Sequence, residues 1–232
     1  MDTKIMNSVK LSKTTLELLK NFASINSNIL VKPGKMIQTI SPVKNVLAQA
    51  TVQETFDVEF GIWDLNKFLG TISLFSDPVF SFGEKSVEIS SEKGNSSVTY
   101  YYSEPKLLTV PTKSLNMPDA VVSFDLTSSM FQELMKAASV MQLNDLCARS
   151  NNGQIELVVM DRSEPTSNNY SVVVGELQDD HDFEFYFKVE NLKLLPGDYH
   201  VEVSDGVVSQ FSHSNLDATY WIALESDSKF NS

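Results

Sequence analysis

The residues that could do chemistry in this sequence are few, and the most suggestive group is DDHD, residues 179–182. Carboxylate oxygens and imidazole nitrogens are common metal ligands. Consecutive residues of a strand point to opposite faces, however, so these side chains cannot converge on one ion unless a special loop holds them. We therefore interpret DDHD as an acidic turn before Phe183 and predict no metal site there.

Enzyme motifs are also missing from the sequence. There is no G-x-S-x-G nucleophile turn, and PGKMIQT, residues 33–39, has one Gly-Lys pair without the glycines of a phosphate-binding loop. His200 and His213 have no patterned partner. The single cysteine, Cys147, lies in the apolar run MQLNDLCA, which favours a buried, unreactive thiol and a reducing, cytoplasmic compartment. We predict that the protein is not an enzyme.

The composition fits a folded, acidic protein. The 232 residues suffice for one large domain or for two of about 110 residues, and a hydrophobic content of 42% argues against disorder. No run approaches the roughly 18 apolar residues of a membrane span, and the first ten residues lack the apolar centre of a secretory signal. The net charge of −12 argues against a nucleic-acid binder, although a phosphate backbone responds only to the face that it meets.

A repeat provides the first positive signal. FDVEFGIWDLNKFLG, residues 56–70, and FEFYFKVENLKLLPG, residues 183–197, match at a constant offset of 127 residues. Each copy predicts an alternating strand, a short helix and a stop at the glycine. Chance similarity between two amphipathic stretches is the alternative. A second strand should follow in each copy, through Ile72 and Leu74 in the first and through Tyr199 and Val201 in the second.

The longer helices recur in the same order. LSKTTLELLKNFASIN, residues 11–26, predicts a helix capped by Ser12, and the apolar spacing after Thr127 or Ser128 predicts another. Between them, residues 104–118 hold three prolines and predict an extended connector. The repeated order favours an internal duplication. Each half should be an α+β unit in which a long and a short helix cover an antiparallel sheet.

Four stretches of the chain are similar to a known protein family. VKLSKTTLELLKNFASIN, WDLNKFLGTISL, LPGDY and ATYWIALESDS resemble the sliding clamps of T-even-type bacteriophages, which are DNA polymerase processivity factors. The resemblance covers nearly the whole chain from Val9 onward and is weakest over residues 77–116.

The resemblance implies a DNA-clamp fold with an extension at residues 1–8 and two similar domains at residues 9–111 and 112–232. Three subunits would form a ring of six domains around duplex DNA, held without sequence preference. A clamp-loader ATPase would open the ring, and the replicative DNA polymerase would be tethered to it. Such clamps are not enzymes and bind no cofactor. The resemblance also implies a role in late transcription and the cytoplasm of an infected bacterial host. The alternative is a duplicated β-rich structural or virion assembly protein.

In clamp rings the long helices line the hole, so lysines on those helices are the expected phosphate contacts. Around the first helix three lysines stand against Glu17, a net charge of +2, which leaves −14 for the rest of the chain. These lysines could also be ordinary solvated helix residues. The expected DNA-facing residues are Lys10, Lys13, Lys20, Lys67, Lys136 and Lys193.

Subunit contacts are expected at two apolar strands, residues 98–102 and 170–177, each of which should pair with the neighbouring subunit rather than face solvent. The expected interface residues are Val98, Tyr100, Tyr102, Val172, Val173 and Val174.

A partner pocket is expected between the connector and the last strand, because clamp partners bring a short apolar peptide to the outer face. For Leu107 and Val110 the alternative is that they seal the two domains together. Phe230 is included because nothing follows it to bury its ring. The expected pocket residues are Leu107, Leu108, Val110, Pro111, Trp221, Ile222, Leu224 and Phe230.

Overall fold

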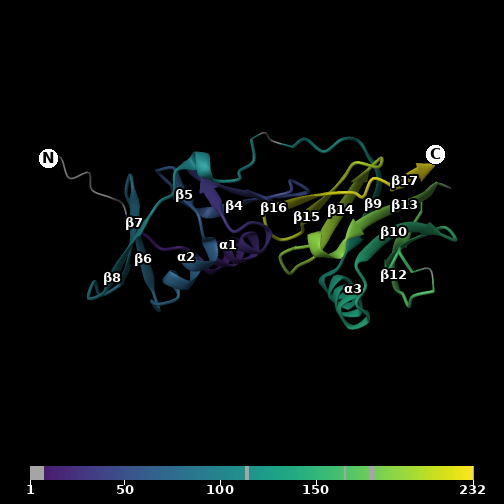
Figure 1. Ribbon diagram of the computed structural model, residues 1–232, viewed down its shortest axis with the longest axis horizontal. Coiled ribbons are helices and arrows are strands. Elements are labelled where there is room, and N and C mark those ends of the chain that lie inside the picture. The colour runs from purple at the N-terminus through teal and green to yellow at the C-terminus, as the bar shows by residue number, and fades with distance from the viewer. Residues whose placement is uncertain (1–7, 113–114, 165, 178–180, 232) are drawn as a thin grey trace. The chain divides into compact units, whose positions relative to one another are not determined.

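The computed structural model describes residues 8–112, 115–164, 166–177 and 181–231. The chain divides into two compact units, residues 1–113 and 114–232 (Figure 1). The described part contains three α-helices, and every strand pairing given below is antiparallel. The α+β class expected from the sequence is therefore confirmed.

Within unit 1 the strands form a four-stranded sheet and two further pairings. The sheet has the order β1-β6-β7-β8, so β8 is an edge strand. The pairs are β2 with β5 and β3 with β4. The strand bounds are β1 Ser8–Val9, β2 Ile29–Val31, β3 Gly34–Ile40, β4 Val46–Phe56, β5 Phe60–Ile62, β6 Pro78–Phe82, β7 Ser86–Ser91 and β8 Ser97–Tyr101.

Helix α1, Lys13–Ile25, begins where the sequence predicted. The Ser12 side chain is the N-cap and accepts a hydrogen bond from the Thr15 N–H at 3.2 Å. Leu18, Leu19 and Phe22 recur at helical spacing and are almost fully buried. The helix packs against α2, β3 and β4, so its apolar face is part of the unit 1 core.

A carboxylate from β4 also holds the start of α1. The Ser12 N–H and the Thr15 hydroxyl both donate to the Glu54 side chain, the hydroxyl at 2.5 Å. Burial by itself would raise the pKa of Glu54, but these hydrogen bonds outweigh it and leave the pKa lowered. Glu54 therefore ties the start of the helix to β4 and accepts from the Ser12 N–H, which has no acceptor within the helix.

The first copy of the repeat forms α2, Leu65–Ile72. Asp64 is its N-cap and accepts from the Lys67 N–H at 2.9 Å. Gly70 lies inside this helix rather than at its end, so the predicted glycine stop is wrong. The predicted strand through Ile72 and Leu74 is wrong for the same reason, because the helix continues through Ile72 and β6 begins only at Pro78.

In unit 2 a five-stranded sheet has the order β12-β11-β10-β13-β17, and four further strands pair in the order β16-β15-β14-β9. Helix α3, Ser128–Met141, packs against β11 and β12 (Figure 1). The strand bounds are β9 Ala120–Leu126, β10 Asp145–Asn151, β11 Gln154–Met160, β12 Tyr170–Glu176, β13 Asp182–Lys188, β14 Tyr199–Ser204, β15 Val208–His213, β16 Ala218–Ala223 and β17 Lys229–Asn231.

Two side chains cap α3. Thr127 accepts a hydrogen bond from the Met130 N–H at 3.3 Å, and Asp198 accepts one from the Ser128 N–H at 2.7 Å. The sequence offered Thr127 or Ser128 as the cap, and the structure has Thr127; the second cap comes from a distant loop. The start of each long helix is therefore held by the side chain of its own N-cap residue and by a carboxylate from elsewhere in the same unit.

The second copy of the repeat does not form the expected short α-helix. Val189–Asn191 form one turn of 3₁₀-helix, and the chain then turns into β14. Pro196 stands where the first copy has Leu69, and proline inside a helix removes a donor and clashes with the carbonyl four residues earlier. The two copies still agree in the burial of their matching leucines, since Leu65 and Leu192 are both buried.

Candidate functional site

The exposed face of α1 carries the lysines predicted to meet DNA. Lys13, Glu17, Lys20 and Ser24 follow one another at helical spacing and are all exposed. Lys13 lies 3.6 Å from Glu17, but its side chain remains 90% exposed. The face therefore presents two lysines to solvent with one acid between them.

The exposed face of α3 is less basic. Lys136 is exposed, and so is Glu133 one turn before it. The Tyr170 hydroxyl donates to the Glu133 carboxylate at 3.2 Å, which raises the pKa of Tyr170. This hydrogen bond links α3 to the start of the edge strand β12.

The remaining predicted lysines are exposed but lie in different settings. Lys67 is in the first turn of α2, and Lys193 follows the 3₁₀ turn rather than lying in a helix. Lys10 precedes α1 and forms an ion pair with Glu92 at 2.6 Å, which raises the pKa of Lys10 and lowers that of Glu92. Lys10 therefore already has a carboxylate neighbour, as Lys13 has in Glu17.

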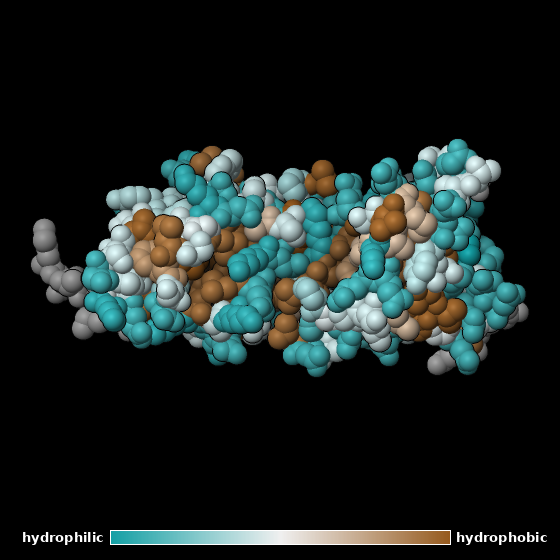
Figure 2. Space-filling view, turned by 90° about the horizontal axis from the view of Figure 1, so that it is seen from below, coloured by the Kyte–Doolittle hydropathy of each residue, from teal (hydrophilic) through white to brown (hydrophobic). Residues whose placement is uncertain are grey.

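Both strands predicted to pair between subunits are edge strands of their own unit. Among the described strands β8 pairs only with β7, and β12 pairs only with β11. Each edge also exposes large side chains, with Tyr101 73% exposed on β8 and Val173 45% exposed on β12. Figure 2 shows one face of the molecule, where hydrophobic side chains reach the surface among hydrophilic ones. The edges therefore offer backbone groups and apolar surface together.

Most of the predicted interface side chains turn toward their own unit. Tyr100 packs edge-on against Phe68 and donates its hydroxyl to the Asp64 carbonyl at 3.3 Å. Tyr102 stacks on Phe60 at 5.5 Å between ring centroids. Val98, Val172 and Val174 are half-buried. Of the predicted interface side chains, Val173 is the one that is exposed, so a second chain would meet it and the edge backbone.

The predicted partner pocket contains residues that are not on the surface. Leu108, Trp221 and Ile222 are no more than 8% exposed. The side chain of Leu108 fills the space beside Gly61, where an added Cβ would come within 2.6 Å of it. Leu107 is 58% exposed, and Leu224 is half-buried. The patterns of the connector and of the last strand predicted apolar character correctly but not which side chains are exposed.

Phe230 also has a partner, so the premise that nothing buries it is wrong. It lies in β17 opposite Phe183, and its ring is parallel to that of Phe185 at 6.4 Å. The tail before it is fixed as well, since Tyr186 donates its N–H to Ser228 Oγ at 2.9 Å and Arg162 forms an ion pair with Asp227 at 2.6 Å. The tail is part of the unit 2 sheet.

A groove in unit 1 brings two predicted pocket residues together with five that the sequence did not suggest. Its volume is about 230 Å³, and Val110 and Pro111 of the connector line it. Met36 in β3 is 48% exposed, which the sequence alone does not show. The other lining residues are Leu30, Lys32, Pro33, Met36 and Gln38.

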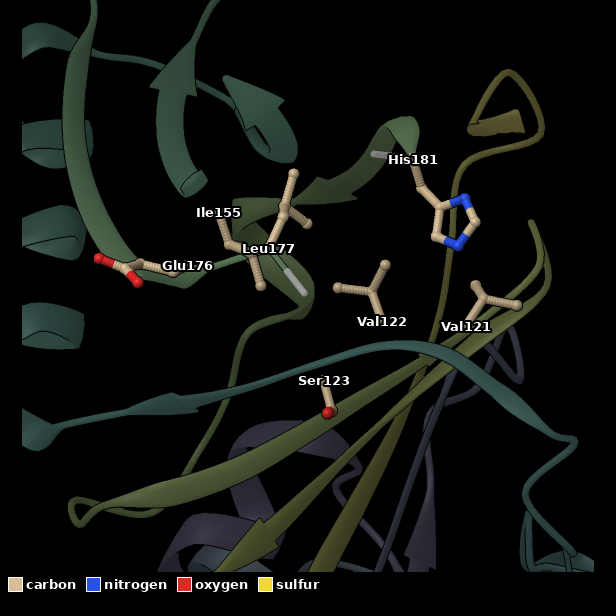
Figure 3. A pocket seen from close by; sticks show the side chains of 7 residues that line it. All are labelled: Val121, Val122, Ser123, Ile155, Glu176, Leu177 and His181. Carbon is tan, nitrogen blue, oxygen red and sulfur yellow. The ribbon is translucent and has the colours of Figure 1, made fainter. Parts of the chain in front are cut away.

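A second hollow, of about 170 Å³, lies in unit 2 beside the end of β12 (Figure 3). Ile155, Leu177 and Val122 lie at its centre, and Glu176 and His181 lie on opposite sides. Its lining is mixed and brings together no groups that could perform catalysis.

The cysteine and the two histidines considered as candidates for chemistry are buried or in contact with neighbouring side chains. Cys147 is buried, and burial raises the pKa of its thiol to about 12. His200 Nδ1 lies 2.8 Å from Asp125, and the His213 ring packs against Tyr199. No group of three or more His, Cys, Asp and Glu side chains among the described residues is placed to hold a metal ion. Asp179 and Asp180 lie outside the described residues.

Within the described ranges no helix is long and apolar enough to cross a membrane. Two units of antiparallel strands, each with a long helix that exposes lysine and each with an open sheet edge, fit the DNA-clamp fold that the sequence resemblance implied.

Family models and solved structures agree with this class. Residues 10–106 match the DNA polymerase processivity factor family, and residues 123–226 match the C-terminal domain of the gp45 sliding clamp. The proliferating cellular nuclear antigen of Entamoeba histolytica has a similar fold, with a TM-score of 0.69 at 12% identity over 94% of this chain and 98% of that one.

Curated relatives give the family. The sliding clamp of Vibrio phage KVP40 is 32% identical over 94% of this chain and 99% of its own length. The sliding clamp of Escherichia phage RB69 is 30% identical over 95% and 98%, and that of Enterobacteria phage T4 is 29% identical over the same shares. The chain belongs to the bacteriophage sliding-clamp family, the DNA polymerase processivity factors.

Proposed function

We propose that three copies of this chain close into a ring around duplex DNA, with residues 9–111 and 112–232 as its two clamp domains. The edge strand β8 of one subunit pairs with β12 of the next, which would satisfy backbone groups that each unit leaves open at its edge. The exposed Tyr101 and Val173 support this pairing because they add apolar surface at both edges. The observation that carries the proposal is the match to phage sliding clamps over nearly the full length of both chains.

The hole of the ring meets DNA through Lys13, Lys20 and Lys136, with weaker contributions from Lys10, Lys67 and Lys193. Their contacts are with phosphates, so binding is independent of base sequence and falls with added salt. The acidic remainder of the surface keeps DNA from other faces, since the chain has a net charge of −12. A small number of lysines on α1 and α3 favours sliding over tight binding.

The ring tethers the replicative DNA polymerase to its template. Encirclement converts dissociation into local release, so the polymerase stays at high effective concentration near the primer end. A clamp-loader ATPase opens the ring. The ring also supports late transcription. Loading, replication and transcription take place in the cytoplasm of an infected bacterial host. The clamp itself catalyses no reaction and holds no cofactor.

The groove lined by Met36, Val110 and Pro111 is the docking site for the polymerase. One solved structure of similar fold, the PCNA of A. fulgidus, has the C-terminal region of FEN-1 bound. The groove in this chain has apolar walls, and Lys32 is the one charged residue among those that line it. A segment with an apolar anchor and a neighbouring carboxylate would fit both features.

The experiment combines light scattering with primer extension on a singly primed circle. A mass of three times 25.9 kDa, and longer products only when loader, ATP and clamp are all present, would support the proposal. Large open assemblies with no effect on product length would favour the structural or virion alternative.

A further inference from the structure

Two asparagines are buried between α1 and β2 in unit 1. Asn26 is the C-cap of α1 and is 2% exposed, and Asn28 is 9% exposed. A buried amide needs hydrogen-bond partners, because leaving its groups without them costs more than one net hydrogen bond. Their partners show what these two side chains hold in place.

Both asparagines bind the connector at a single residue. The Thr109 N–H donates to Asn28 Oδ1 at 3.0 Å, and the Thr109 carbonyl accepts from Asn26 Nδ2 at 3.1 Å. The Asn28 N–H donates in turn to Asn26 Oδ1 at 3.1 Å. Thr109 thus has both backbone groups bound by side-chain amides, as a neighbouring strand would bind them. The connector is fixed at the residue before Val110.

Asn26 reaches the opposite wall of the groove as well. Its Nδ2 also donates to the Ile40 carbonyl at 2.8 Å. Ile40 ends β3, the strand that provides Met36 and Gln38, whereas Thr109 precedes Val110 and Pro111. One NH₂ group therefore bridges the two segments between which the groove lies.

We propose that Asn26 and Asn28 are positioning residues for the partner groove: their side-chain amides hold the connector at Thr109 and the end of β3 at Ile40, and so set the spacing of the two walls. This inference rests on the proposed role of the groove as the polymerase site. A preformed groove binds more tightly because its walls need not be ordered when the partner arrives.

Two variants remove the amide contacts in different ways. Asn26→Asp keeps the shape but puts a carboxylate oxygen where an NH₂ group faced two carbonyls, and Asn95→Asp is its control because Asn95 is exposed. Thr109→Pro removes the N–H that Asn28 accepts without changing either asparagine. Leu108 has ψ of 143°, which suits a residue before proline. Thr109→Ala keeps both backbone groups and is the second control.

The measurements are amide hydrogen exchange over residues 105–112 and binding to the immobilised replicative polymerase. We expect Asn26→Asp and Thr109→Pro to speed exchange of the connector by about tenfold or more and to weaken polymerase binding by about tenfold, with the trimer mass unchanged. Both controls should stay within about twofold of the wild type.

The proposal is overturned if connector exchange or polymerase binding is unchanged in Asn26→Asp and Thr109→Pro. It is also overturned if exchange rises equally throughout unit 1, since that would be general destabilisation. If the wild-type clamp does not bind polymerase, the proposed function of the groove fails, and the exchange measurement alone then decides whether the amides position the connector.

Discussion

Charge reversal on the exposed faces of both long helices should weaken DNA binding in a defined way. The double variant Lys20→Glu, Lys136→Glu changes two exposed lysines, one on α1 and one on α3. Within the described part of the chain neither forms an ion pair, whereas Lys13 lies 3.6 Å from Glu17. The change should therefore act on DNA contacts rather than on helix stability.

The size of the effect follows from counterion release. Each phosphate contact on duplex DNA contributes about 0.9 to the slope of log K against log salt. Because the double variant removes two lysines from each of three subunits, the slope should fall by at most about five units. If the duplex contacts one subunit at a time, the slope should fall by about two units. Base sequence should not alter either figure, because the contacts are with phosphates.

Salt titrations of the clamp with a short fluorescent duplex would measure the slope. Lys85→Glu is the control, since Lys85 is exposed in the turn between β6 and β7 and makes the same charge change away from the helices. If the double variant keeps the wild-type slope, or if Lys85→Glu lowers it equally, α1 and α3 do not face the DNA.

Four further changes test other parts of the account. A proline at Val173 removes a backbone donor of β12 and should raise the concentration at which the trimer dissociates in sedimentation; an unchanged trimer would exclude this edge. Glu54→Gln should lower the free energy of unfolding by about 1 kcal/mol at pH 7 in urea titrations, whereas Glu59→Gln at an exposed site should not. Because the pKa of Glu54 is lowered, its contribution is present above the unfolded-state pKa and is lost as pH falls through the folded-state value; a pH-independent difference would contradict this. Met36→Asp should weaken polymerase binding at least about tenfold with trimer mass intact, and normal binding would remove the groove from the site. Truncation after Leu224 removes β17 and should lower the unfolding midpoint of unit 2, and an unchanged midpoint would show that the tail does not stabilise the sheet.

The long helices could be predicted because their signals are local. Ser12 and Thr127 are N-caps in the structure as expected, and the apolar spacing after them matches the buried faces of α1 and α3. Both predicted interface strands are also edges of their sheets, although alternation alone could not show that. Local patterns therefore sufficed to identify the elements.

The errors came from effects of single residues and of distant contacts. Pro196 prevents the second short helix even though the surrounding pattern repeats that of α2. Phe230 is covered because the tail adds a strand beside β13, and no local pattern predicts which strand a tail will join. Leu108 was expected at the surface, and it is buried because Gly61 leaves space for its side chain.

The groove and its asparagines were missed for a related reason. Asn26 and Asn28 resemble ordinary residues after a helix, and their bonds to Thr109 span more than 80 residues of sequence. Met36 would have been a signal only if its exposure were known. Sites assembled from a hairpin and a connector depend on tertiary packing, which periodicity does not encode.

The central claim is that this chain encircles DNA. Its most direct test is whether the clamp is released when a circular DNA that carries it is cut. Clamp is loaded onto a nicked circular duplex with its loader and ATP, the protein that is not bound is removed, and the circle is then cut once with a restriction enzyme. Encirclement predicts that the clamp stays on the intact circle at high salt, where phosphate contacts are screened, and leaves the linear product by sliding off its ends. Equal retention on circular and linear DNA would contradict the ring.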